Sequence, residues 1–448
     1  MVDVVVVGLG VGGEEVAGKL AEAGLEVVGT ERSLVGGECP YWACVPSKMM
    51  IRAANLLADG RRIAGMAGTA TVQPDWAPVA ARIRVEATDN WNDQVAVDRF
   101  TGKGGRFIRG SGTLVGPKRV AVGDETIEAR RGVVLAVGTT ATIPPIDGLA
   151  GTPFWTNHQA IEASTLPSSL LVLGAGAVGV ELAQVFARFG VRVTMIEAKD
   201  RVLAGEEPES SEVVATALER DGITIRTGAT VRRVDHHGAE FTVTLADGTS
   251  ASGEKLLVAV GRTVNLAGLG LEHAGLDPTA AAIGVDDRMR AADGLWAIGD
   301  ATGMGAYTHM AMYQAAITVR DILGQDGPAA DYAAVPRVTF TDPEIGAVGF
   351  TEVQARDHGL TVRTASARIP SSARGWIHKA GNDGFVKLVI DSDRDLIVGA
   401  TSAGPVGGEV LSALSVAVHG RVPVATMRSM IYAYPTFHRA IEDALKSL

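Results

Sequence analysis

Residues 2–13 read VDVVVVGLGVGG, a β-branched run that ends in a glycine turn. The alanine- and glutamate-rich stretch after it predicts a helix to about Ala23. A second apolar run, Leu25–Gly29, leads to Glu31. This order of strand, glycine turn, helix, strand and acid is typical of a unit that binds a dinucleotide.

The residues of this turn have separate roles. Gly8 permits the tight turn, Gly10 lets backbone N–H groups approach a pyrophosphate, and Gly13 allows the helix to pack closely. The helix N-terminus adds partial positive charge. Glu31 can accept hydrogen bonds from a ribose.

The same pattern occurs a second time. Leu170–Leu173 runs into the turn GAGAVG at 174–179, a helix is expected to about Phe189, and the strand Arg192–Ile196 ends at Glu197. The matching glycines are Gly174, Gly176 and Gly179. Two such units, each with an acid at the same offset, predict two nucleotide-binding domains.

The composition predicts a multidomain globular chain. Its 448 residues suggest about three domains, and 46% apolar content is ample for several cores. The formal net charge of −10 and the scarcity of long basic runs argue against a nucleic-acid partner. No apolar run approaches the roughly 20 residues of a membrane span, and no signal peptide is recognised. We therefore expect a cytoplasmic protein without a membrane span, and no pattern predicts a metal site.

Further strands are expected between and after the two units. A helical stretch at Ser47–Leu57 precedes strand-like segments that end in GVVLAVGT at 132–139. A later strand, Gly294–Ile298, leads into Gly299 and Asp300. The carboxylate of Asp300 can turn toward a polar ligand.

The pattern changes from about Pro336 to alternating strands, Arg337–Phe340 and Gly384–Ile390. Helices follow near Glu409–His419 and Pro435–Lys446. This part has no phosphate-type turn, so we assign it to dimerisation and to shaping the active site. The predicted fold class is α/β, with two Rossmann-like dinucleotide-binding domains and a C-terminal α+β dimerisation domain.

The chain has two cysteines, Cys39 and Cys44. They lie too close together to form the framework of a secreted fold, so their role should be chemical. Four intervening residues can form an irregular turn that brings both sulfurs into bonding range. A helix that starts near Ser47 would place its N-terminus by Cys44 and stabilise a thiolate there.

The segment GGECPYWACVPSK at 36–48 resembles the active-site signature of the pyridine nucleotide–disulfide oxidoreductases, which include dihydrolipoamide dehydrogenase, glutathione reductase and mercuric reductase. The resemblance covers essentially the whole chain. It implies an FAD-containing, NAD(H)-linked homodimer in which Cys39 and Cys44 form a redox-active disulfide against the flavin. The implied domains are an FAD-binding domain in two parts, 1–145 and 267–335, an NAD-binding domain at 146–266 and a dimerisation domain at 336–448.

The resemblance also implies site residues. Cys44 is the flavin-proximal sulfur and Cys39 the interchange sulfur, while Lys48 lies beside flavin N5 with Glu181 as its acidic partner. The residues implied to bind FAD are Gly8, Gly10, Gly13, Glu31, Gly37, Lys48, Gly112, Thr139, Asp300 and Thr308. Those implied to bind NAD are Gly174, Gly176, Gly179, Glu197, Val231, Gly261 and Arg262.

Glu197 favours NADH over NADPH. A carboxylate accepts hydrogen bonds from free ribose hydroxyls and repels an additional phosphate. Nearby Lys199 and Arg201 could soften that repulsion.

The segment YPTFHR at 434–439 departs from the family. Thiol reductases of the family carry a histidine at the position of Tyr434 and a glutamate at that of Arg439. A histidine can pass a proton to a leaving thiolate, whereas an unperturbed tyrosine, with a pKa of about 10, is a poor base. His438 is close in sequence, but a helix that starts at Thr436 would place it one turn in.

These observations predict an enzyme that passes electrons from NADH to FAD, to the Cys39–Cys44 disulfide and on to an unidentified small-molecule acceptor, with Tyr434 as a hydrogen-bond donor. One alternative is a flavin reductase that serves a quinone, a dye or dioxygen without needing Cys44. Another is chemistry like that of ketopropyl-coenzyme M oxidoreductase/carboxylase, which also has an aromatic residue in place of the histidine but a histidine where Lys48 stands. A non-catalytic redox sensor is the alternative from a different class.

Overall fold

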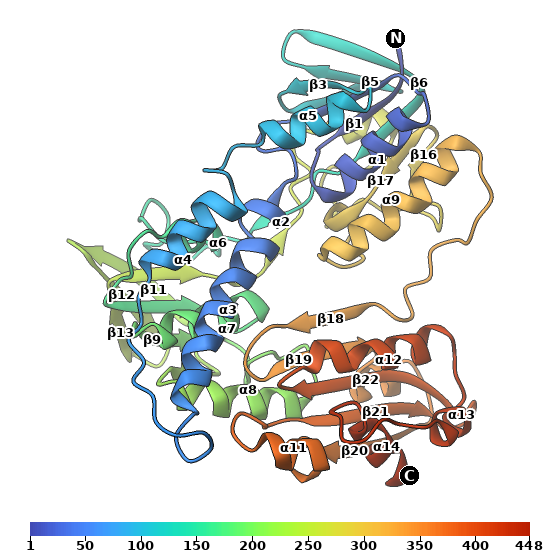
Figure 1. The fold of residues 1–448 in the computed structure, drawn as a ribbon. Coiled ribbons are helices and arrows are strands. Elements are labelled where there is room, and N and C mark those ends of the chain that lie inside the picture. The colour runs from blue at the N-terminus through green and yellow to red at the C-terminus, as the bar shows by residue number, and fades with distance from the viewer. The chain divides into compact units, whose positions relative to one another are not determined.

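The computed structural model describes residues 1–448, and the chain divides into two compact units (Figure 1). The first unit comprises Met1–Ser47, Ala81–Thr142 and Arg262–Tyr332, and the second comprises Lys48–Ala80, Ile143–Gly261 and Ala333–Leu448. The second unit therefore combines most of the expected NAD-binding and dimerisation segments with residues 48–80, which were expected in the FAD-binding domain. No helix combines the length and the hydrophobicity that a membrane span requires.

An eight-stranded sheet forms the centre of the first unit. β1 (Val2–Val7) lies between β2 (Val27–Glu31) and β6 (Glu125–Leu135) and pairs with both in parallel. The other strands of the sheet are β3 (Arg106–Arg109), β4 (Gly112–Gly116), β5 (Arg119–Val122), β16 (Arg290–Ala292) and β17 (Leu295–Ala297). β7 (Thr140–Ala141) and β15 (Arg262–Thr263) form a separate antiparallel pair.

Seven helices lie wholly within the first unit. They are α1 (Val11–Glu22), α2 (Glu38–Tyr41), η1 (Ile83–Ala87), α5 (Gln94–Gly102), η2 (Leu271–Ala274), η3 (Gly299–Thr302) and α9 (Thr308–Leu323). Two further helices, α3 (Cys44–Arg61) and α4 (Ala77–Arg82), begin in one unit and end in the other.

Both faces of the first sheet are covered, which accounts for the continuous valine run of β1. Val4 and Val6 pack in one cluster with residues of α1 and α9, which lie side by side in Figure 1. Val5 and Val7 pack in a second cluster with residues of β4, β5 and β6. The two clusters follow from the alternation of side chains along a strand.

A parallel sheet forms the nucleotide-binding part of the second unit, in the order β10-β9-β8-β14. Its strands are β8 (Ser169–Leu173), β9 (Arg192–Ile196), β10 (Thr224–Arg226) and β14 (Lys255–Val258). The hairpin sheet β11 (Val231–His237), β12 (Glu240–Leu245) and β13 (Ser250–Gly253) accompanies it. The helices of this part are α6 (Asn157–Glu162), α7 (Ala177–Arg188) and α8 (Pro208–Arg220).

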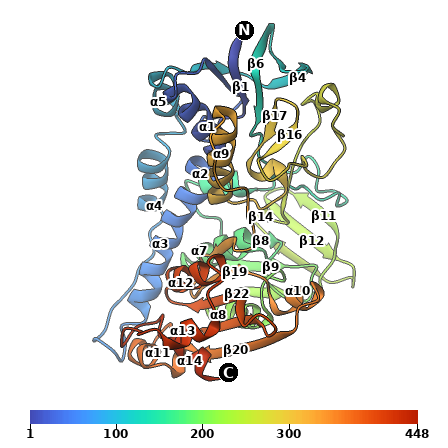
Figure 2. The ribbon, with the colours of Figure 1, turned by 90° about the vertical axis from the view of Figure 1, so that its right-hand side faces the viewer.

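The C-terminal part of the second unit is an antiparallel sheet, in the order β18-β19-β22-β21-β20, with helices on it. Its strands are β18 (Pro336–Thr339), β19 (Glu344–Gly349), β20 (Val362–Arg368), β21 (Phe385–Asp391) and β22 (Leu396–Gly404). Its helices are α10 (Glu352–Asp357), η4 (Ile369–Ser371), α11 (Ala373–His378), α12 (Gly407–His419), α13 (Val424–Ser429) and α14 (Ala440–Lys446). α12 packs against β19 and β22, as Figure 2 shows.

The starts of two helices differ from those expected, and α3 also ends later, at Arg61 rather than Leu57. α3 begins at Cys44 rather than near Ser47, and the Ala43 carbonyl already accepts the Ser47 N–H at 3.0 Å. α14 begins at Ala440, so the expected helix from Pro435 is wrong over its first residues. Turns occupy that stretch, because the Thr436 hydroxyl donates to the Ala433 carbonyl at 2.7 Å.

Candidate redox-active site

The first glycine turn has the shape that a bound pyrophosphate requires. Gly8 has φ +90°, and a Cβ there would lie 2.5 Å from the Ala136 carbonyl oxygen. A Cβ on Gly13 would lie 1.9 Å from the Gly8 oxygen, whereas one on Gly10 would meet no atom within 4 Å. Two glycines are thus required by packing and the middle one faces open space. α1 starts at that open space without a side-chain cap, so its first N–H groups are available to an anion.

The second turn repeats this arrangement. A Cβ on Gly174 would lie 2.4 Å from the Ala259 oxygen, and one on Gly179 would lie 2.2 Å from the Gly174 oxygen. Gly176, like Gly10, has open space around its Cβ position, and α7 starts there without a side-chain cap. The residues present therefore fit two dinucleotides, one at each turn.

The two acids also occupy equivalent places. Glu31 accepts the Leu9 N–H at 2.9 Å and the Ser33 N–H at 2.7 Å. Glu197 accepts the Ala175 N–H at 2.7 Å and the Lys199 N–H at 2.8 Å. Each carboxylate is held at the rim of its glycine turn, where it retains lone pairs for ribose hydroxyls.

The cysteine segment lies directly on the first glycine turn. The Gly36 N–H donates to the Leu9 carbonyl at 2.7 Å. Gly37 has φ +68°, and a Cβ there would lie 2.9 Å from the Cα of Gly10. This close approach of two backbones needs glycine, and it places α2, which carries Cys39, beside the turn expected to bind FAD.

The two cysteines are reduced, half-buried thiols that interact with each other. The hydrogen bond with Cys44, and then burial, raise the pKa of the Cys39 thiol far above its ordinary value. Cys44 is the first residue of α3, where the helix dipole favours negative charge on its sulfur. Its Sγ lies 3.2 Å from the Thr308 hydroxyl oxygen at the start of α9. The reduced pair is therefore arranged with the proton on Cys39.

Lys48 and Glu181 meet as expected. The Lys48 ammonium lies 2.7 Å from Glu181 Oε2, and it also lies 4.5 Å from the centre of the Phe340 ring. The other carboxylate oxygen of Glu181 accepts the Phe340 N–H at 2.8 Å. Glu181 is nearly buried, so the ion pair is well defined in geometry. Lys48 follows Cys44 by one turn of α3.

Two of the residues expected to line the FAD, Thr139 and Asp300, are hydrogen-bonded to each other in the first unit. Thr139 donates through its hydroxyl to Asp300 Oδ2 at 2.6 Å. Gly112 opens β4, where a Cβ would meet the Thr30 hydroxyl at 3.0 Å. Arg262, expected with the NAD residues, donates to the Thr139 hydroxyl and carbonyl oxygens at 2.7 and 2.8 Å.

The remaining expected NAD residues lie in the second unit. Val231 opens β11, and Gly261 follows β14 with φ +127° and open space at its Cβ position. Their contact with a dinucleotide stays a prediction, as does that of Arg262.

The C-terminal departure from the family forms a local cluster. Tyr434 is 69% exposed, and the Arg439 guanidinium lies 5.3 Å from the centre of its ring. Arg439 is held by Glu442 at 2.8 Å and donates to the Tyr432 carbonyl at 3.3 Å. The His438 imidazole lies 3.3 Å from the Thr436 hydroxyl oxygen, ahead of α14 rather than within it.

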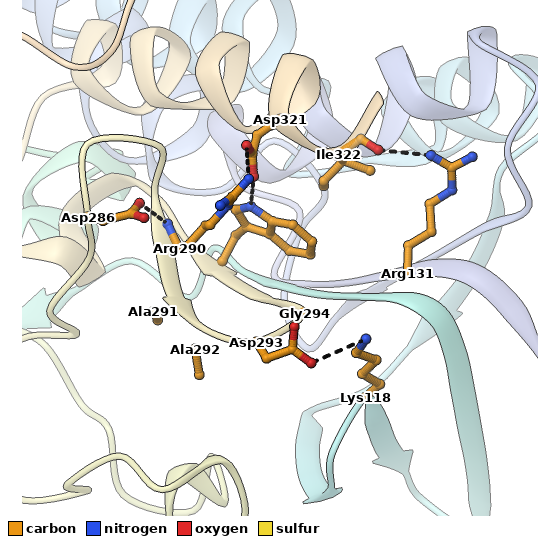
Figure 3. A pocket seen from close by; sticks show the side chains of 11 residues that line it. Lys118, Arg131, Asp286, Arg290, Ala291, Ala292, Asp293, Gly294, Asp321 and Ile322 are labelled. Carbon is orange, nitrogen blue, oxygen red and sulfur yellow. Dashed lines mark hydrogen bonds and ion pairs between the residues drawn. The ribbon is translucent and has the colours of Figure 1, made fainter. Parts of the chain in front are cut away.

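A hollow of about 730 Å³ in the first unit lies apart from these residues (Figure 3). Its charged side chains bond to one another or to the backbone: Arg290 donates to Asp321 at 2.7 Å, and Arg131 donates to the Ile322 carbonyl at 2.8 Å. None of the residues expected to bind a cofactor lines it. No group of three His, Cys, Asp or Glu side chains suited to a metal ion is found.

Known proteins are similar to this chain over essentially its whole length. A family model described as pyridine nucleotide-disulphide oxidoreductase matches residues 2–317, and the model of the dimerisation domain of that family matches residues 335–445. Dihydrolipoyl dehydrogenase of Zymomonas mobilis is 31% identical over 99% of this chain and 97% of its own length. Mercuric reductase of Shigella flexneri is 29% identical over 99% of this chain and 80% of its own length.

A solved structure agrees with these matches. The HOCl-induced flavoprotein disulfide reductase RclA from Escherichia coli, also solved as a Cu(II) complex, superposes with a TM-score of 0.87. Its sequence is 25% identical, and the match covers 99% of both chains.

Proposed function

Because the chain belongs to the pyridine nucleotide-disulphide oxidoreductase family, we propose that it passes electrons from NADH through FAD to the Cys39–Cys44 disulfide and on to a small-molecule acceptor. As a member of this family it is a flavoprotein enzyme that binds FAD and uses NAD(P)H, and its dimerisation domain supports a homodimer. The acceptor and the use of both cysteines are the proposed part. The observation that supports the use of both cysteines is the packing of the cysteine segment on the first glycine turn.

The residues around the thiols have separate roles. Bound FAD supplies the exchange of a hydride with the nicotinamide and of two electrons with a disulfide. Glu181 holds the Lys48 ammonium in one place, so that a fixed positive charge lies one helical turn from Cys44. The N-terminus of α3 and the Thr308 hydroxyl stabilise negative charge on Cys44.

Cys39 is then the sulfur that meets the acceptor. Its raised pKa keeps it protonated at neutral pH, so attack on a disulfide acceptor needs a base. Tyr434 is a phenol and serves as a hydrogen-bond donor instead. The proposed acceptor is therefore one that does not require rapid thiol–disulfide exchange.

NADH is the proposed pyridine nucleotide. Glu197 presents its carboxylate at the second turn, where a 2′-phosphate would be repelled. Arg201 uses its Nη1 and Nη2 groups within its own loop, where they donate to the Leu203 and Ala204 carbonyls and to the Ser211 hydroxyl. These bonds direct part of its donor capacity to the loop at 203–211.

Anaerobic titration with NADH tests the electron route. Reduction of the disulfide should produce a long-wavelength absorption band from a Cys44 thiolate beside the flavin. Cys39→Ser should show the band without NADH, because Cys44 then has no disulfide partner, and Cys44→Ser should never show it. The route is excluded if the unaltered protein stays free of the band while its flavin is fully reduced.

A second candidate is direct reduction of an acceptor by the flavin, without the cysteines. The paired departure at Tyr434 and Arg439 favours it, since both residues that would serve thiol exchange differ. Cys44→Ser decides between the two: retained quinone reduction supports the second candidate, and its loss supports the first. The acceptor panel should contain lipoamide and glutathione disulfide, together with Hg(II) and Cu(II), because a relative is a mercuric reductase and RclA was solved with Cu(II).

A further inference from the structure

Arg262 lies where the chain re-enters the first unit. It opens β15, which pairs with β7 immediately after Thr139. The family resemblance implies that Arg262 binds NAD. Its side chain, however, makes its contacts within the first unit. Those contacts lead in two directions.

The first direction leads to Asp300. The Arg262 Nε–H donates to the Thr139 hydroxyl oxygen at 2.7 Å, and the Nη2–H donates to the Thr139 carbonyl at 2.8 Å. An oxygen that accepts from arginine directs its own hydrogen elsewhere, and here it donates to Asp300 Oδ2 at 2.6 Å. Arg262 thus orients both Thr139 and Asp300, two of the residues proposed to contact the FAD.

The second direction leads to the cysteine segment. Arg262 Nη1 lies 3.6 Å from Glu38 Oε2. Glu38 is the first residue of α2 and directly precedes Cys39. Both side chains are partly exposed, so the pair adds little to stability, but it brings a positive charge to the start of α2.

We propose that Arg262 is a positioning residue that holds the cysteine-bearing helix α2 and the Thr139–Asp300 pair in register around the flavin. A guanidinium suits this role because its planar donors reach several acceptors in fixed directions, which an ammonium does not. The inference rests on the proposed flavin site. It adds to that proposal that Arg262 aligns the helix α2 with the Thr139–Asp300 pair.

Arg262→Gln tests the inference in the holoenzyme. We expect about tenfold weaker retention of FAD, as for the loss of a charged hydrogen-bond donor, and at least a halved NADH-induced long-wavelength band. The half-saturating NADH concentration should change less than about twofold. Arg262→Lys should lie between the two. Arg106→Gln removes only a surface ion pair with Glu125 and is the control. It should retain FAD and show the band like the unaltered protein.

Two further variants separate the two directions. Thr139→Val should weaken FAD retention and leave the cysteine band per bound flavin unchanged. Glu38→Gln should lower the band and leave FAD retention unchanged. They also keep the test decisive if Arg262→Gln does not fold.

The inference is overturned if Arg262→Gln retains FAD and the band but needs much more NADH, since Arg262 would then serve the nucleotide. It is also overturned if Thr139→Val and Glu38→Gln both behave like the control. Absence of the band in the unaltered protein is a different result, because it contradicts the proposed electron route rather than the role of Arg262.

Discussion

The Arg439 guanidinium lies 5.3 Å from the centre of the Tyr434 ring, so the two residues that depart from the family contact each other. A cation over an aromatic face is attractive. Elsewhere in the family, a glutamate holds a histidine that acts as a base. Here Tyr434 replaces that histidine, and the permanent cation Arg439 replaces the glutamate. Arg439 is itself fixed by Glu442.

Restoring the family pair should restore thiol exchange. A histidine at 434 alone would stand beside the Arg439 cation, which disfavours its protonated form. We therefore expect Tyr434→His to raise lipoamide turnover only modestly, and Tyr434→His with Arg439→Glu to raise it by about 100-fold, the lower range for a positioned base. Steady-state NADH oxidation measures both. Rapid lipoamide turnover by the unaltered protein would show that no base is missing.

Nucleotide preference should respond to Glu197. Glu197→Gln keeps an acceptor for the Ala175 N–H but removes the negative charge. We expect kcat/KM for NADPH to rise about tenfold and that for NADH to fall a few-fold, on the scale of one charge interaction at a partly exposed site. Arg201→Gln should leave the ratio unchanged, because that guanidinium holds its own loop. An unchanged ratio in Glu197→Gln would remove Glu197 from the nucleotide site.

The glycine turns allow binding to be separated from folding. Gly10→Ala and Gly176→Ala place a methyl group in open space, whereas Gly13→Ala places one 1.9 Å from a backbone oxygen. We expect Gly10→Ala to fold without retaining FAD, and Gly176→Ala to keep FAD but to need far more NADH. Gly13→Ala should lower the melting temperature, by several degrees or more for a loss of about 2 kcal/mol. Flavin content and thermal unfolding distinguish the three. A yellow Gly10→Ala protein would mean that the pyrophosphate lies elsewhere.

The reactivity of Cys39 should depend on Cys44. The thiol pair and burial raise the pKa of Cys39, so its thiolate is scarce until the pH rises well above the range of an ordinary thiol. In the NADH-reduced protein, alkylation of Cys39 at pH 8 should be slow and should still increase with pH at the alkaline end. Cys44→Ala removes the largest cause of the shift and should accelerate alkylation at pH 8. Mass spectrometry of the alkylated peptide measures the rate, and equal rates in both proteins would contradict the assigned protonation.

Short stretches of sequence were sufficient for the parts of this protein that depend on local geometry. The glycine turns at 8–13 and 174–179, the acids after them and the adjoining strands were predicted from spacing alone, and the structure has them. The α/β fold was predicted from the two repeated units, and the membership of the family and the cofactors were predicted from the signature around Cys39; the comparisons confirm all three.

Helix ends were predicted less well, since they depend on individual hydrogen bonds. α3 starts at Cys44 because Ala43 already accepts from Ser47, and α14 starts late because Thr436 bonds back to Ala433. Neither bond has a signature in the residue pattern. The first places the helix dipole at Cys44 itself, and the second leaves His438 outside the helix.

Contacts between distant residues were decided by the tertiary structure alone. Cys44 and Thr308 are 264 positions apart, and Arg262 and Thr139 are 123 apart. Cys44 follows β2 and Thr308 follows β17, and both strands belong to one sheet with β1 and β6 between them. Arg262 meets Thr139 because β15 pairs with β7, which directly follows Thr139. Sequence spacing carries no information on such pairs. Thr308 and Arg262 were predicted as site residues from the family resemblance, but their contacts with Cys44 and with Thr139 come from the tertiary structure alone.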